Sequence, residues 1–178
     1  MKRFLLLAIF LIAWPVALSA APVPPSKGQW GFALEESLPL YEKADINADS
    51  EYVDFSGEWF SVPSAVRDED NNLWYKVNIN GKSGWLAQNG VRLKMGGKSK
   101  TAANFYKTFL KKQSVLQSLM GLTQEQIRKK FGTPTMRETP YDDSDVNILS
   151  YELAGQKKSI TFSITLRNNI VEGAEFHM

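Results

Sequence analysis

Cysteine is absent from this chain of 178 residues. Disulfides, a lipid-modified N-terminal cysteine and cysteine-based metal or redox chemistry are therefore excluded. Histidine is nearly absent as well, because His177, beside the C-terminus, is the only one. A Ser-His-Asp arrangement would have to use that single terminal residue. We therefore expect a protein that is not an enzyme and that uses no metal and no cofactor.

Long apolar runs are lacking after the N-terminus. There, Lys2 and Arg3 precede an apolar stretch at residues 4–13, and small residues gather at 17–21. This order is typical of a secretory signal peptide, with cleavage near residues 19–20. A retained anchor is the alternative, although the stretch falls short of the roughly 20 residues that a spanning helix needs. We expect a periplasmic or secreted protein that is not a lipoprotein and has no stable membrane span.

A charge excess of one sign is also lacking, because 21 basic residues stand against 19 acidic ones. The charges are nevertheless sorted along the chain. Residues 27–91 hold 5 basic and 11 acidic side chains, whereas residues 92–130 hold 10 and 1. Nucleic acid is therefore not an expected partner, since only the middle segment is cationic and it carries no nucleic-acid motif. That segment predicts either a solvated lysine face or a surface for an anionic lipid, an acidic wall polymer or the acidic part of the chain.

Residues 30–93 show short alternating runs with polar loops between them, which predicts strands. The clearest signal is the pair Asn80-Gly81 between the alternating runs 73–79 and 82–86. Both residues tolerate the positive φ angles of a type I′ turn, so a β-hairpin is predicted there. A proline-rich lead-in at residues 21–29 precedes this part, and a glycine-rich linker at 94–100 follows it.

Five landmarks follow one another in the N-terminal part: Leu38-Pro39-Leu40, Val53, Gly57-Glu58-Trp59-Phe60, Trp74-Tyr75-Lys76-Val77 and Gly81-Lys82-Ser83-Gly84-Trp85-Leu86. With these landmarks the N-terminal part resembles a bacterial SH3 (SH3b) domain. The resemblance implies an all-β SH3-like barrel over residues 30–93 that recognises a cell-wall peptide or glycan. One departure is Gly90, which stands where many members place a tyrosine of the binding groove.

The C-terminal part, residues 101–178, predicts two helices followed by antiparallel strands. Helical spacing of apolar residues runs from 101 to 120, and a second helix begins at Thr123, a good N-cap with Gln126 three positions later. Strands are expected at 147–153, 159–166 and 170–176. The fold class predicted for the whole chain is thus two domains: an SH3-like barrel, then an α+β domain of two helices packed on an antiparallel sheet of about three strands.

The order of helices and strands in residues 115–178 is accompanied by a segment that runs from Gly121-Leu122-Thr123 to Phe131-Gly132-Thr133-Pro134. In both features this part resembles the small outer-membrane lipoprotein A family, which is related to the BamE component of the β-barrel assembly machinery. Members usually carry a lipidated cysteine, which this chain lacks. The resemblance implies an envelope-assembly or inhibitor protein that binds a protein partner through this part.

The expected ligand-binding residues follow from the resemblance to bacterial SH3 domains. Tyr41, Trp74 and Trp85 would line an aromatic groove, with Lys76 or Glu42 at its rim. For Tyr41 and Trp85 the alternative is a purely structural role in closing the barrel. Acidic surroundings would favour ligands with free amines, such as the stem peptides of peptidoglycan.

Two acidic loops are candidates for cation binding, but their spacing does not fit a calcium loop. Residues 142–145 contain three aspartates, and residues 68–72 read Asp-Glu-Asp-Asn-Asn. The glycine and the terminal glutamate of an EF-hand are missing from both. We expect solvated loops at both places.

Overall fold

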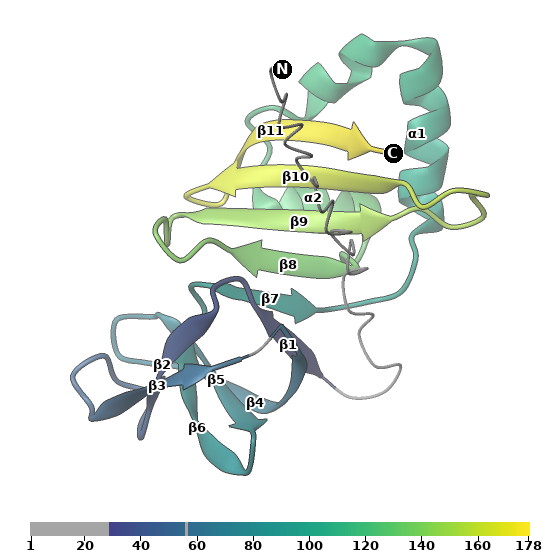
Figure 1. Ribbon diagram of the computed structural model, residues 1–178. Coiled ribbons are helices and arrows are strands. Elements are labelled where there is room, and N and C mark those ends of the chain that lie inside the picture. Colours follow the sequence, from purple (N-terminus) through teal and green to yellow (C-terminus); the bar gives the residue numbers. More distant parts are fainter. Residues whose placement is uncertain (1–28, 56) are drawn as a thin grey trace, which may run out of the picture.

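The computed structural model describes residues 29–178 with the exception of residue 56 (Figure 1). The predicted signal peptide, and all but the last residue of the predicted proline-rich lead-in, lie outside the described residues. No helix in the described part of the chain is long and apolar enough to cross a membrane.

Eleven strands of the described residues form one continuous antiparallel sheet (Figure 1). They are β1 (Trp30–Ala33), β2 (Ser37–Tyr41), β3 (Ser50–Asp54), β4 (Trp59–Arg67), β5 (Leu73–Ile79), β6 (Lys82–Ala87), β7 (Val91–Lys94), β8 (Met136–Thr139), β9 (Val146–Glu152), β10 (Thr161–Arg167) and β11 (Ile170–His177). Their order across the sheet is β11-β10-β9-β8-β7-β1-β4-β5-β6-β2-β3. The N-terminal and C-terminal strands therefore belong to the same hydrogen-bonded layer.

The predicted fold class, an SH3-like barrel followed by a separate α+β domain, is wrong. The cause is β8, whose sequence Met-Arg-Glu-Thr is too polar and too short to be recognised as a strand. It pairs with β7 from Val91↔Thr139 to Lys94↔Met136, and with β9 on its other side. Hydrogen bonds thus run from the first strands to the last without a break. The predicted domain boundaries are a separate matter and stay a prediction.

Three short helices, rather than two, lie between β7 and β8 in sequence: α1 (Lys100–Lys111), η1 (Gln113–Leu119) and α2 (Gln124–Phe131). The helix predicted at 101–120 ends early, because Lys112 has an extended backbone and a 3-10 helix follows it. The predicted start of the second helix is confirmed. Thr123 and Gln126 form a reciprocal capping box that satisfies two otherwise free amide groups.

Two clusters of buried apolar side chains lie along the sheet. The N-terminal cluster contains Phe55, Tyr75, Val77 and Leu86, all 2% exposed or less. The C-terminal cluster joins residues of the three helices to β9, β10 and β11, with Phe162 fully buried among aromatic rings. Figure 1 shows α2 behind these C-terminal strands. Each half of the sheet therefore has its own core.

The predicted hairpin at Asn80-Gly81 is confirmed. Asn80 has φ 49° and Gly81 has φ 77°. Ile79 lies opposite Lys82, and the pairing continues to Trp74 opposite Ala87. The turn fixes the register of β5 and β6, and with it the positions of Trp74, Lys76 and Trp85.

Candidate binding groove

Trp74, the central residue of the predicted groove, lies inside the protein at 2% exposure. Its ring meets the Tyr41 ring edge-on, with the centroids 5.2 Å apart. Its indole Nε1 donates a hydrogen bond of 2.8 Å to Oδ2 of Asp68. A ring in this position presents almost no surface to a ligand. It packs against the ring of Tyr41 instead.

Asp68 organises the loop between β4 and β5, which the sequence predicted to be merely solvated. Besides the indole, Oδ1 accepts from the backbone amide of Asn72 at 2.8 Å, and Oδ2 accepts from the Asn72 side chain at 3.1 Å. These bonds, that from Trp74 above all, hold the pKa of Asp68 below its ordinary value of 3.8. The carboxylate is therefore a structural anchor for the tryptophan.

Asp68 should make the protein less stable in acid. A carboxyl whose pKa is lower in the folded state stabilises that state above its unfolded pKa, and this contribution is lost as the pH falls through the folded pKa. We expect the free energy of unfolding to decrease below about pH 4. In Asp68→Asn, which has no such titration, the decrease is smaller. Urea denaturation at several pH values measures it.

Glu69→Gln is the matched control, since Glu69 is an exposed neighbour in the same loop. It should keep the acid dependence of the wild type. If Asp68→Asn and Glu69→Gln have the same dependence on pH, the assignment to Asp68 is incorrect.

The other predicted groove residues lie nearer the surface. Tyr41, 9% exposed, is opposite Trp85 in the pairing of β2 with β6. Trp85 is half-buried, and the exposed Lys76 holds its Nζ 5.9 Å from the Trp85 ring centroid. Glu42 is exposed and lines a hollow of about 510 Å³ that Tyr41 also borders. The structure thus brings Tyr41 together with Trp74, Trp85 and Glu42, and Trp85 together with Lys76.

A second hollow, of about 240 Å³, is also lined by Tyr41. It is lined by Leu38, Pro39, Tyr41, Ile46, Leu86, Ala87, Asn89 and Tyr141. Tyr52 on β3 is directly opposite Pro39, so its side chain is on the same face as Pro39. We call this hollow, with Tyr52 at its rim, the tyrosine groove.

The tyrosine groove gathers large side chains that are open to solvent. Tyr52 is 71% exposed, Ile46 is 63% exposed and Tyr141 is 46% exposed. Single exposed apolar residues are normal, but a cluster of them around a hollow marks a binding site. The described structure therefore offers an accessible aromatic surface beside Tyr41, whereas the Trp74 ring is covered.

Tyr141 comes from the loop between β8 and β9, far away in sequence, and covers Gly90. A β-carbon placed on Gly90 would lie 3.1 Å from Cδ2 of Tyr141 and 2.9 Å from Cδ2 of Leu38. The backbone amide of Gly90 donates to the carbonyl of Thr139 at 2.8 Å, which brings this loop close. The glycine that replaces a groove tyrosine in the sequence is therefore covered by a tyrosine from the other half of the sheet.

The three phenols of the tyrosine groove lie near one another and near acidic groups. Burial raises the pKa of Tyr41, and the neighbouring Tyr141 and Tyr52 raise it further. Partial burial also raises the pKa of Tyr141, with contributions from Tyr52 and Glu35. Both hydroxyls are therefore protonated at neutral pH; that of Tyr141 is hydrogen-bonded to Tyr52, and the oxygen of each phenol can accept a hydrogen bond from a ligand.

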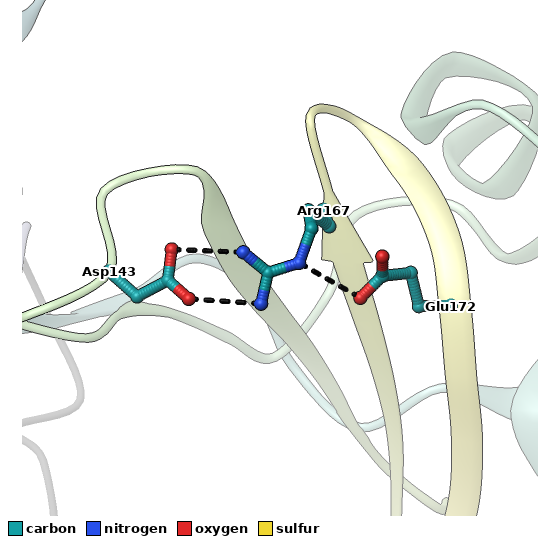
Figure 2. Close-up of polar contacts among 3 residues, drawn as sticks. All are labelled: Asp143, Arg167 and Glu172. Carbon is teal, nitrogen blue, oxygen red and sulfur yellow. Dashed lines mark hydrogen bonds and ion pairs between the residues drawn. The ribbon is translucent and has the colours of Figure 1, made fainter.

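Arg167 fixes the loop that carries Tyr141. Figure 2 shows its guanidinium between the carboxylates of Asp143 and Glu172. Nη2 lies 3.0 Å from Oδ2 of Asp143, and Nε lies 3.2 Å from Oε2 of Glu172. One of the three aspartates at 142–145 is thus an ion-pair partner that ties the β8–β9 loop to β10 and β11. In the described part of the chain, no group of three acidic or histidine side chains is placed to hold a metal ion.

Sequence reasoning missed Ile46, Tyr52 and Tyr141. Tyr52 lies in an alternating strand, and its large apolar ring at a position facing solvent was a usable signal. Tyr141 had none, because its role depends on the pairing of β7 with β8.

Comparison of the chain with family models, curated proteins and solved structures gave no significant match.

Proposed function

We propose that the protein is an exported, non-enzymatic binding protein that holds a cell-wall peptide in the tyrosine groove. The observation that supports this most is the solvent-open cluster of Ile46, Tyr52 and Tyr141 around a hollow bordered by Tyr41. Tyrosine rings give a large contact area at a low cost in side-chain entropy, and their hydroxyls bond polar groups. The resemblance to bacterial SH3 domains favours a peptide of the wall as the ligand.

Charge next to the groove favours a ligand with free amines. Glu42, Asp49 and Glu51 line the other hollow that Tyr41 borders. Glu51 is paired with Lys82 at 2.9 Å, which leaves Glu42 and Asp49 as the acidic groups without an ion pair among the described residues there. A stem peptide would place its backbone over the rings and an amine toward these two carboxylates.

The double variant Tyr52→Ala, Tyr141→Ala tests the proposal. We expect its affinity for purified peptidoglycan to fall by about 30- to 700-fold, because loss of each of the two aromatic anchors costs roughly 1–2 kcal/mol. Tyr52 is 71% exposed and Tyr141 is 46% exposed, and neither belongs to the buried core, so the variant should stay folded. Sedimentation with insoluble peptidoglycan over a range of protein concentrations measures the change.

Leu110→Ala is the matched control, since Leu110 on α1 is 64% exposed, as Ile46 is at 63%. It should bind like the wild type, whereas Ile46→Ala should bind more weakly. Equal retention of the wild type and the double variant would show that the tyrosine groove does not bind peptidoglycan. A single protein adduct at residues beyond 121, found by crosslinking in cells without any wall binding, would support the alternative of an envelope partner.

A further inference from the structure

Another hollow, also of about 240 Å³, opens where the two halves of the sheet meet, and its lining is almost entirely polar. Its walls include Arg67 and Asn71 at the β4–β5 loop, Arg137 on β8, and Asn168 and Asn169 at the β10–β11 turn. We call it the carboxamide cleft. It shares no lining residue with the tyrosine groove.

Two guanidinium groups in the carboxamide cleft have no acidic partner within residues 29–178 as far as the structure describes them. Arg137 is half-buried and donates a hydrogen bond to the hydroxyl of Tyr75. Arg67 donates to the backbone carbonyl of Asn71 at 2.6 Å. Among the described residues, neither has an ion pair within 4.0 Å. Arg67 is exposed and Arg137 is partly removed from water, and a guanidinium in the second situation favours an anionic ligand.

The two arginines lie close enough to act on one buried group. Burial raises the pKa of the Tyr75 phenol, and the charges of Arg137 and Arg67 both oppose that change. Of the described residues that line the cleft, Asp145 alone carries a carboxylate. The cleft therefore keeps an excess of positive charge that its own residues do not neutralise.

Carboxamide groups make up most of the remaining lining. Asn71, Asn168 and Asn169 have positive φ angles of 67°, 49° and 65°, so each is held in a tight turn. A carboxamide offers both donors and an acceptor, which suits the hydroxyl groups of a sugar. The near absence of apolar surface in the cleft disfavours a lipid or an aromatic ligand.

The cleft continues into a neighbouring hollow across Gln124 and Asn169, which line both. This neighbour, at the start of α2, is lined by Arg128 and Lys129 together with one acidic residue, Glu125, and its lining is more apolar than that of the cleft. The surface that adjoins the carboxamide cleft therefore also carries more cationic than acidic side chains.

From these observations we infer that the carboxamide cleft binds an anionic saccharide. The acidic group of the sugar lies at Arg67 and Arg137, and its hydroxyls bond the asparagines of the turns. A carboxylate and a phosphate both fit a guanidinium, so either can supply the charge. This site adds a second ligand class to the proposed binding of a wall peptide and does not depend on it.

Titration of the full mature chain with small probes, followed by NMR, tests the inference. The probes are glucuronic acid, glucose 6-phosphate, glucose and inorganic phosphate. We expect one of the two acidic sugars to bind at least about tenfold more tightly than glucose and than inorganic phosphate. If glucose binds as well as both acidic sugars, or if phosphate alone binds as well as they do, the inference is overturned.

Variants of the lining separate binding from folding. Arg67→Gln should weaken binding of the acidic sugar by about tenfold. Lys157 is an exposed cation in the β9–β10 connection, and Lys157→Gln should leave this binding unchanged. Asn168→Gly keeps the positive φ of the turn and removes the carboxamide, and should also weaken binding. Asn80→Gly makes the same change in the β5–β6 turn, outside the cleft, and serves as its control. Unchanged affinity in both Arg67→Gln and Asn168→Gly contradicts the assignment.

Discussion

Replacing Trp74 with alanine should lower the free energy of unfolding by about 3–5 kcal/mol. The indole is 2% exposed, packs edge-on against Tyr41 and donates to Asp68 at 2.8 Å. Alanine removes these contacts, leaves a cavity under Tyr41 and deprives the Asp68 carboxylate of its main donor. Urea denaturation followed by far-UV circular dichroism measures the loss, since this signal does not depend on the deleted fluorophore.

Trp85→Ala is the control for this prediction. Trp85 is half-buried and lies on the neighbouring strand, so its removal should cost no more than about 1–2 kcal/mol. If Trp74→Ala is no more destabilising than Trp85→Ala, the structural role given to Trp74 is incorrect. The comparison also shows why a variant of Trp74 is a poor probe of ligand binding, because any loss of binding would include a loss of folded protein.

Gly90→Ala should lower the free energy of unfolding by about 2–5 kcal/mol. Gly90 has φ 76°, a left-handed conformation that costs a non-glycine residue about 1–2 kcal/mol. The added methyl group would also lie 2.9 Å from Leu38 and 3.1 Å from Tyr141. These neighbours must move, so the substitution should weaken peptidoglycan retention as well as stability.

Gly81→Ala separates the two effects of Gly90→Ala. Gly81 has nearly the same φ, 77°, but nothing lies within 4 Å of a β-carbon placed there. The free energy of unfolding of Gly81→Ala should fall by only about 1–2 kcal/mol, and this variant should keep its peptidoglycan binding. Thermal unfolding and sedimentation with peptidoglycan give both quantities. Equal losses in the two variants would mean that the ring of Tyr141 does not rest on Gly90.

Local signals in the sequence were enough to predict individual elements. Asn80-Gly81 identified its hairpin and Thr123 with Gln126 identified the start of α2, since each signal depends on residues a few positions apart. The continuity of the sheet depends on β8, which pairs with β7 from about 45 positions away and has no apolar alternation of its own. No local pattern records a pairing of that kind.

The candidate site was predicted in part, and the reason is similar. Alternation in β5 placed Trp74 on one face and Tyr75 on the other, and both are 2% exposed. A period of two residues assigns a side chain to a face of the strand, but it does not say whether that face is covered. Here the Tyr41 ring and the β4–β5 loop cover Trp74. The accessible rings are those of Tyr52 and Tyr141, which the sequence did not single out.

The position of Tyr141 has a practical consequence for anyone who wishes to transplant the recognition surface into another protein. A fragment of residues 30–93 would lack Tyr141, whose ring contacts Gly90. It would also lack Arg167, whose ion pair with Asp143 holds the loop that carries Tyr141. The cut would also strip β7 of the neighbour on its outer side, so that its backbone amides and carbonyls would be free to pair with other chains. A transplanted binding surface must therefore include β8, β9 and the loop between them, together with Arg167, which forms an ion pair with Asp143 of that loop.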